Sequence, residues 1–327
     1  MDSLTLYDVA KRMDPKGQVA KIAELLTQTN EILLDMPFIE GNLPTGHKTT
    51  VRTGLPEVAW RELYGGVPQG KSTTKQVIDT CGMLEAYSLV DKKLAELNGN
   101  KASFMLSESR PFLEAMNQEM GRVLFYGKSS EKSKILGLTS RFSTLSGADN
   151  SENVINAGGS SALASIWLVC LGEETVHGFY PKGSRVGLHQ DPTVELKESV
   201  TLDDGRTGHY QALSTHYIWE TGLCVRDWRY VVRICNIGTS TLTKNKSSGA
   251  DLVDLLDQAV EKLPNLQLGK PVIYMNRTLR SFLRRQIKNT SNVHLTLEDI
   301  GGRKVVAYDG IPVRMCDQLT NNEDLVS

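Results

Sequence analysis

The sequence predicts an α+β fold in which helices and antiparallel strands occupy separate stretches of the chain. Ser107–Tyr126 carries a continuous apolar stripe at helical spacing. Ser165–Ile237 holds consecutive strand-like runs joined by short turns, a pattern that favours antiparallel pairing over βαβ units. Ala250–Met315 reads as helix, strand, helix and hairpin, in that order. These three stretches define the predicted fold class.

Length and composition are those of a soluble globular protein. A chain of 327 residues can form two or three packed subdomains and needs no disulfide or metal to fold. Its 37 basic and 38 acidic residues give a net charge of −1, which argues against wrapping nucleic acid by charge alone. No segment approaches the roughly 18 apolar residues of a membrane helix, and the N-terminus has no signal-peptide run. We therefore expect a protein that is made and kept in a reducing cytoplasm.

The cysteines and histidines predict neither a disulfide framework nor a metal site. The cysteine count is odd, no C-x-x-C pair occurs, and three of the five lie inside apolar strand-like runs. The cysteines are Cys81, Cys170, Cys224, Cys235 and Cys316, and the histidines are His47, His177, His189, His209, His216 and His294. No two histidines are four residues apart, and none lies at a metal-ligand spacing from a cysteine. We expect buried thiols, structural or surface histidines, and no cofactor or metal.

The first eighty residues are expected to form an N-terminal arm and helix (1–41) and an extended β-hairpin loop (42–80). Gln18–Leu34 has apolar residues on one helical face. Lys48–Thr53 and Lys71–Ile78 are extended segments with too few apolar residues for a core of their own. Such an arm lies either on its own domain or on a neighbouring subunit, and the pattern favours neither.

The next predicted unit, 81–237, combines a long helix with the β-rich block. In the helix Ser107–Tyr126, Pro111 is expected in or near the first turn, where a missing N–H is tolerated. Gly127 is placed to end the helix in a left-handed cap. In the β-rich block, Asp204-Gly205 supplies a hairpin turn. Its strand-like runs are Ser165–Leu171, Thr175–Tyr180, Thr207–Glu220 and Gly222–Ile237.

A small, polar segment without periodicity, 238–249, is the predicted linker to a C-terminal α/β unit, 250–327. That unit begins with an acidic helix, Asp251–Leu263, and the apolar strand Pro271–Met275. A basic helix, Arg277–Lys288, follows, and then a hairpin turning on Asp309-Gly310, VVAYDGIPV. No position in this run has a catalytic pattern.

The two C-terminal helices carry opposite charges and supply most of the candidate assembly residues. The basic face holds Arg277, Arg280, Arg284 and Lys288, and the acidic stripe holds Asp251, Asp254, Asp257 and Glu261. The basic face is solvated, pairs with the acidic stripe in the same chain or on a neighbour, or contacts nucleic-acid phosphates. Arg52, Lys71 and Lys75 of the extended loop complete the candidate assembly interface.

Gly65–Ser72, GGVPQGKS, matches the phosphate-binding pattern G-x-x-x-x-G-K-[ST]. In that motif a helix must start at the Lys-Ser step and point its positive end at the phosphates. Here the next residues, TTKQVID, are β-branched and alternating, which is poor for a helix. We interpret the segment as a Gly/Pro turn in an extended arm and keep nucleotide binding as a minor alternative.

These segments together resemble the major capsid proteins of tailed double-stranded DNA phages, which share the Johnson fold, the HK-ninety-seven type. DLVDLLDQAVEKL, VIYMNRTLRSFLRRQ and YDGIPV are similar to the axial domain of that fold. The arm 42–79 resembles its extended loop, which reaches over an adjacent subunit, and Ser107–Tyr126 resembles its long spine helix. The chain most resembles the short-tailed phage capsid proteins of the epsilon-fifteen and Bordetella-phage kind.

The order of elements departs from the family pattern. In the family, the segment after G-x-P-V leads into a long β-rich C-terminal stretch, whereas only about a dozen residues follow Val313 here. The β-rich strands come before the axial-type unit instead. The resemblance therefore implies a peripheral and an axial domain whose elements are joined in a rearranged, permuted order.

The resemblance implies a non-enzymatic major capsid protein of the virion, assembled in the host cytoplasm. Pentamers and hexamers of one subunit would close into an icosahedral shell around packaged double-stranded DNA, held by non-specific contact. Cement or decoration protein, scaffold and portal are the expected partners, and no membrane is involved. The alternatives are a nanocompartment shell protein of the same fold and a nucleotide-binding enzyme using Gly65–Ser72.

Overall fold

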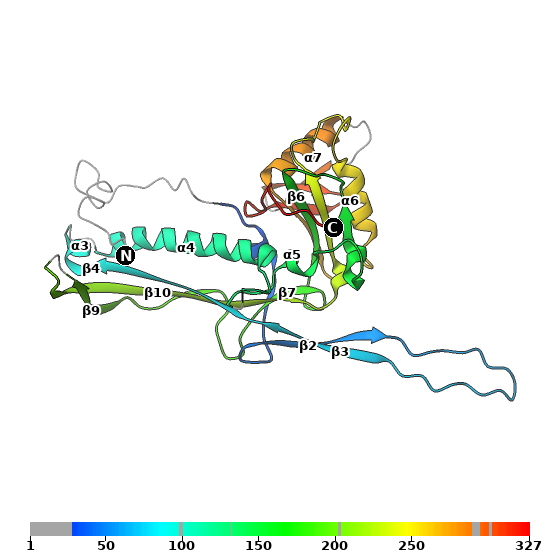
Figure 1. The fold of residues 1–327 in the computed structure, drawn as a ribbon, viewed down its shortest axis with the longest axis horizontal. Helices are drawn as coiled ribbons and strands as arrows, with labels where there is room; N and C mark the ends of the chain where they lie inside the picture. The colour runs from blue at the N-terminus through cyan, green and yellow to red at the C-terminus, as the bar shows by residue number, and fades with distance from the viewer. Residues whose placement is uncertain (1–27, 98–100, 132, 202–203, 290–294, 301–302) are drawn as a thin grey trace.

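The computed structural model describes residues 28–97, 101–131, 133–201, 204–289, 295–300 and 303–327. Three bodies make up the molecule (Figure 1). A head of stacked helices and sheet holds the C-terminus, and a flat plate extends from it along one long helix. A two-stranded arm leaves the junction of head and plate in another direction and ends in a long loop.

The helices and strands alternate irregularly along the chain. The helices are α2 (Ile32–Asp35), α3 (Lys92–Glu96), α4 (Lys101–Tyr126), α5 (Leu138–Arg141), α6 (Leu252–Glu261) and α7 (Arg277–Asn289), with 3₁₀ turns at η1 (Asp149–Asn153) and η2 (Trp228–Tyr230). The strands up to the plate are β1 (Phe38–Glu40), β2 (Gly46–Gly54), β3 (Thr73–Thr80), β4 (Gly82–Asp91), β5 (Val154–Asn156), β6 (Leu163–Leu171), β7 (Val176–Tyr180), β8 (Leu188–Gln190) and β9 (Val194–Thr201). The remaining strands are β10 (Thr207–Val225), β11 (Val231–Gly238), β12 (Lys270–Met275), β13 (Leu295–Ile300), β14 (Arg303–Tyr308) and β15 (Ile311–Met315).

The head is a three-layer structure built on a sheet that is buried on both faces. Every residue of β6 is buried, which explains its unbroken apolar run LASIWLVCL. Alternate residues enter opposite cores. Ile166 and Leu168 pack with α6 and α7, whereas Trp167 and Val169 pack with the C-terminal end of α4. The sheet therefore needs a helical layer on each side.

The plate consists of β4, β9 and β10 with α4 lying along them (Figure 1). β10 pairs antiparallel with β4 from Ala212 to Thr221 and then with β7 from Gly222 to Val225. The sequence predicted two strands here, but one strand of 19 residues runs through Gly222 and joins the plate to the head. The predicted hairpin before it is confirmed, since β9 pairs antiparallel with β10 and Gly205 has a φ of +81°.

The long helix is confirmed, but α4 starts at Lys101, six residues before the predicted Ser107. Pro111 therefore lies inside the helix, and its expected place in the first turn is wrong. The proline removes one N–H from the helical ladder. Burial of Phe104 against Val90 in a small core at the far end of the plate stabilises the added turns, so tertiary packing outweighs the proline.

Gly127 ends α4, but not in the predicted left-handed conformation, because its φ is not positive. The glycine is required by a close backbone approach. A Cβ at Gly127 would lie 2.1 Å from the Ile135 carbonyl oxygen and 2.8 Å from that of Val123. Hydrogen bonds from Gly127 N–H to Val123 and from Gly137 N–H to the Gly127 carbonyl close this crossing.

The predicted N-terminal helix Gln18–Leu34 differs in the part that the structure describes. Residues 18–27 lie outside the described residues, and helical structure begins only at Ile32, in α2. The N–H of Thr29 donates to the Asp317 carboxylate, and the N–H of Glu31 donates to the Met315 carbonyl. These bonds to the C-terminal segment hold the backbone extended where periodicity predicted a helix.

The C-terminal run matches its prediction closely. α6, β12 and α7 lie within two residues of the predicted bounds, and Asp309 and Gly310, at φ +49° and +74°, form the predicted turn between β14 and β15. The sheet itself is mixed, because β12 runs parallel to β15, β5 to β11, and β1 and β6 to β7. The expectation of purely antiparallel pairing is therefore wrong.

Segment 238–249 does not separate two sheets. β6, which precedes this segment, pairs with β12, which follows it. Residues from both sides of the segment also share one core. In the described part of the chain, no helix is long and apolar enough to cross a membrane.

Replacing Gly127 with alanine should destabilise the unassembled subunit by about 1–3 kcal/mol, because the new methyl group forces the crossing backbones apart. Gly66→Ala is the matched control, since a Cβ at Gly66 meets nothing within 4 Å, and its effect should stay within about 0.5 kcal/mol. Urea denaturation of both variants measures the difference. Equal unfolding free energies for the two variants would contradict the packing account.

Candidate assembly surfaces

The arm formed by β2 and β3 projects away from the rest of the molecule (Figure 1). Its strands pair antiparallel from Gly46 opposite Thr80 to Gly54 opposite Thr73. The base packs against β10, but the outer loop, 55–72, lies on no other element of the described chain. Of the two predicted alternatives, an arm that rests on its own domain is therefore wrong.

The outer loop of the arm exposes large apolar side chains. Trp60 and Tyr64 are fully exposed, at 104% and 101% of their reference areas. The exposed apolar side chains of the loop are Leu55, Val58, Trp60, Leu63, Tyr64 and Val67. In contrast, the core residue Trp167 is completely buried. We call this set of six side chains the arm tip.

The phosphate-loop alternative fails on geometry. Gly65–Ser72 lies in the outer loop, and strand β3 begins at Thr73, where nucleotide binding requires a helix N-terminus. Tyr64 has a φ of +67°, and the Gly65 N–H donates to the Glu62 carbonyl, which marks a tight turn. The interpretation as a turn in an extended arm is confirmed. Arg52, Lys71 and Lys75 are all exposed along this arm.

The acidic residues of α6 have local roles. Asp251 caps the helix by accepting from the N–H groups of Val253 and Asp254 and forms an ion pair of 2.8 Å with Lys246. Asp254 accepts a hydrogen bond from Gln258. Asp257 accepts one from the Tyr308 hydroxyl, and burial followed by this bond raises the pKa of Tyr308. Glu261 is exposed at the end of the helix.

The basic residues of α7 divide into one paired and three outward-facing groups. Arg277 forms a bidentate pair with Asp317, at 2.6 and 2.8 Å, which holds the pKa of Asp317 below its usual range. The buried Nε of Arg280 makes no hydrogen bond in the described structure. Arg284 and Lys288 are exposed.

No ion pair among the described residues joins the bases of α7 to the acids of α6. Both helices turn their apolar faces to the same core, with Leu256 and Leu283 buried there, so their charges point outward. The predicted pairing within one chain is therefore wrong. Pairing with a neighbouring subunit or with nucleic acid remains a matter for the assembled state.

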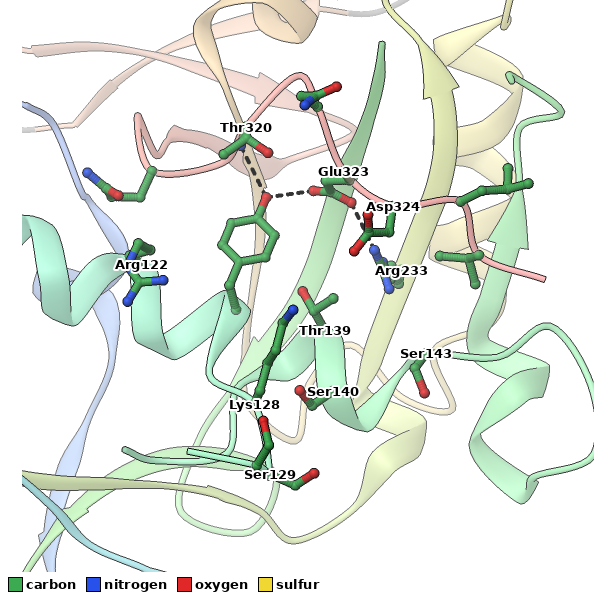
Figure 2. A pocket seen from close by; sticks show the side chains of 16 residues that line it. Arg122, Lys128, Ser129, Thr139, Ser140, Ser143, Arg233, Thr320, Glu323 and Asp324 are labelled. Atoms are coloured by element: carbon green, nitrogen blue, oxygen red, sulfur yellow. Dashed lines mark hydrogen bonds and ion pairs between the residues drawn. The ribbon is translucent and has the colours of Figure 1, made fainter. Parts of the chain in front are cut away.

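A polar pocket lies where the C-terminal segment crosses the head (Figure 2). At its centre Arg233, only 1% exposed, forms an ion pair of 2.8 Å with Glu323. Arg233 also donates to the Ser165 hydroxyl at 3.2 Å and to the Phe142 carbonyl at 2.8 Å. Its guanidinium lies 5.1 Å from the centre of the Trp167 ring. We call this cluster the C-terminal clasp.

The other oxygen of Glu323 accepts a hydrogen bond of 2.6 Å from the Tyr126 hydroxyl, which in turn accepts from the Thr320 N–H (Figure 2). Burial and then the charge of Glu323 raise the pKa of Tyr126. The groups neutralise one another, so the clasp is built to hold the chain end, not to react. Sequence reasoning missed it, although Arg233 inside the apolar strand VVRICNI signalled a buried partner.

The fold also brings together residues that the sequence analysis kept apart. One nitrogen of His47, one nitrogen of His177 and the sulfur of Cys224 lie within 4.8 Å of one another. They come from β2, β7 and β10, far apart in the chain. Spacing rules for metal ligands along a sequence could not find this cluster.

Comparison with known proteins identifies the family. The profile of the family described as "Major capsid protein GP7" matches residues 14–327. The chain belongs to this family of major capsid proteins. It is thus a phage capsid subunit, and the virion shell is its place of action. No curated protein sequence matches the chain.

Solved structures agree with the family. The capsid chain of bacteriophage epsilon15 is 34% identical, with a TM-score of 0.80, and the match covers 100% of this chain and 98% of that one. The bacteriophage JBD30 capsid, at 9% identity and a TM-score of 0.47, covers 90% and 93%. The SrpI encapsulin of Synechococcus elongatus PCC 7942, at 11% identity and 0.40, covers 71% and 96%. The last two matches are too distant to carry an argument.

The permuted element order that the sequence suggested is not confirmed. The match to the epsilon15 capsid chain spans both proteins from end to end. The prediction treated the β-rich block as a separate unit, but β6 and β11 from that block belong to the core sheet of the head. The family model also favours a phage capsid over the nanocompartment alternative.

Removing the cation of the clasp should strongly destabilise the subunit. Arg233→Met leaves the buried Glu323 carboxylate without its counter-charge, and we expect a loss of about 3–5 kcal/mol. Arg229→Met is the control, because Arg229 forms a similar pair with Asp227 at a side chain that is 57% exposed. Such a pair contributes at most about 1 kcal/mol. Thermal and urea denaturation would contradict a central role for the clasp if both variants were equally stable.

Proposed function

We propose that the arm tip docks on a neighbouring subunit and thereby links the subunits of the capsid shell. The observation that carries this proposal is the fully exposed tip, whose tryptophan and tyrosine are residue types that dominate protein interfaces. Soluble proteins rarely leave such a patch uncovered. A two-stranded arm is marginal alone in water, so contact with a neighbour would also stabilise the arm itself.

The head and the plate correspond, in this proposal, to the axial and peripheral domains of a capsid subunit. Pentamers and hexamers would place the head, with α6 and α7, around their axes. The shell would enclose double-stranded DNA by non-specific contact, and scaffold, portal and decoration proteins would be its partners. Support for the packing scheme comes from the elongated shape, with a head and an arm at different ends of the plate (Figure 1).

The outward charges of α7 are assigned to a neighbouring head. Arg280 and Arg284 face away from the core, and the buried Nε of Arg280 still lacks an acceptor. An acidic stripe on the next subunit would supply one. Such charge pairs set register and suppress wrong pairings more than they add affinity.

The arm-tip proposal predicts that Trp60→Ser with Tyr64→Ser abolishes shell formation and leaves the subunit folded. Both side chains are fully exposed, so their loss should change the subunit's unfolding free energy by less than about 0.5 kcal/mol. The control variant, Trp60→Phe with Tyr64→Phe, keeps the aromatic surface and should assemble. Negative-stain microscopy and sedimentation measure shells. Wild-type yields of shells from the serine variant would refute the proposal.

The assignment of α7 predicts that Arg280→Glu with Arg284→Glu blocks assembly, because like charges then meet across the subunit contact. Arg280→Lys with Arg284→Lys keeps the charge and should assemble. Assembly is measured from purified subunits without DNA. Normal empty shells from the glutamate variant would exclude pairing between subunits, and a packaging defect in those shells would indicate that the residues contact DNA.

A further inference from the structure

Two cross-strand pairs of metal-binding residue types face each other where the arm meets the body. In the arm, His47 of β2 lies opposite Asp79 of β3. In the body, His177 of β7 lies opposite Cys224 of β10. The rings of His47 and His177 meet edge to face, with centroids 5.6 Å apart. The two pairs belong to separate sheets, so only the folded arm brings them together.

The polar atoms of this cluster lack hydrogen-bond partners. His177 is 1% exposed, and neither of its ring nitrogens makes a hydrogen bond of normal geometry. The same holds for Nδ1 of His47 and for Oδ2 of the buried Asp79. Oδ1 of Asp79 is held by Arg141 at 2.7 Å. Buried polar groups are almost always paired, so this concentration of unpaired atoms points to a missing partner that accepts lone pairs.

We propose that His47, His177 and Cys224 bind a zinc ion at the base of the arm, with Asp79 as the fourth ligand. Imidazole nitrogen and thiolate sulfur are the ligands of zinc and not of calcium or magnesium. Bond lengths of about 2.0–2.3 Å place ligand atoms roughly 3.5 Å apart around zinc. Small side-chain rotations would close the present 4.8 Å separation to that value.

The chemistry of the ligands fits this assignment. Burial lowers the pKa of both His47 and His177, so each imidazole is neutral at neutral pH and keeps a lone pair. Burial, followed by the negative charge of Asp79, raises the pKa of Cys224 to about 12. The thiol is therefore protonated without metal. Binding breaks its S–H bond, forms a Zn–S bond and releases one proton to solvent.

The zinc ion would fasten the arm to the body. It would join β2 to β7 and β10, strands that otherwise belong to different sheets. Phe179, whose ring centroid lies 5.4 Å from that of His47, covers one side of the cluster. The arm would then keep a fixed direction while its tip remains free to meet a neighbour.

Titration of the full-length, unassembled subunit with Co²⁺ tests the site. We expect a thiolate-to-cobalt absorption band in the near ultraviolet, saturating at about one ion per chain and displaced by Zn²⁺. Zn²⁺ should also raise Tm by several degrees. Wild-type protein without the thiolate band would overturn the proposal whether or not any variant folds.

Substitutions locate the binding. Cys224→Ser should remove the thiolate band, and His177→Gln should weaken Co²⁺ binding at least about tenfold and cancel the Tm shift. The controls are Cys81→Ser and His209→Gln, which alter a half-buried cysteine and an exposed histidine outside the cluster. A band that survives Cys224→Ser, or that is lost in Cys81→Ser, would show that the metal binds elsewhere and would sink the assignment.

Discussion

The buried guanidinium of Arg233 is the constraint on which the head depends. A charge with 1% exposure is costly unless every donor is satisfied. Its donors reach Ser165 on β6, the Phe142 carbonyl after α5, and Glu323 in the C-terminal segment. Glu323 in turn reaches Tyr126 at the end of α4. Four separate segments must therefore be in place before the charge is neutral, and this makes the packing of the head cooperative.

The C-terminal segment is thus a structural part of the head. Asn236 exchanges two hydrogen bonds with Val326, and the Glu323 N–H donates to the Leu163 carbonyl. Arg277 and Asp317 add a bidentate pair nearer the surface. The same segment extends to Thr29 and Glu31 near the other end of the described chain. Both ends of the described chain are therefore held against one sheet, whose two buried faces require covering layers.

Local patterns predicted the elements whose stability is local. The amphipathic periods of α6 and α7, the apolar β12 and the Asp309-Gly310 turn could all be read from the sequence, because periodicity and turn chemistry determine them. The start of α4 could not, since burial of Phe104 at the far end of the plate outweighs Pro111. Nor could the N-terminal helix, where hydrogen bonds to the C-terminal segment replace it.

The candidate sites follow the same division. The exposed charges of the arm and α7 were visible as sequence patterns, because surface residues need no distant partner. The Arg233–Glu323 pair spans 90 residues, and the cluster of His47, His177 and Cys224 spans three strands. Such sites depend on sheet register, which a single sequence specifies only through long-range pairing. A lone charge in an apolar strand was the one available signal.

The arm combines two opposing physical requirements. A two-stranded ribbon has few apolar contacts of its own, yet it must present its tip at some distance from the body. The structure concentrates its fixed contacts at the base. Asp79 pairs there with Arg141, which also donates to the Leu223 carbonyl of the body. The Asn42 side chain exchanges hydrogen bonds with the backbone of Lys48. A firmly held base sets the direction of the arm, and the uncovered apolar tip leaves most of the arm's stabilisation to be gained on contact with a neighbour. Assembly and ordering of the arm then become one event, which favours a closed shell over isolated subunits.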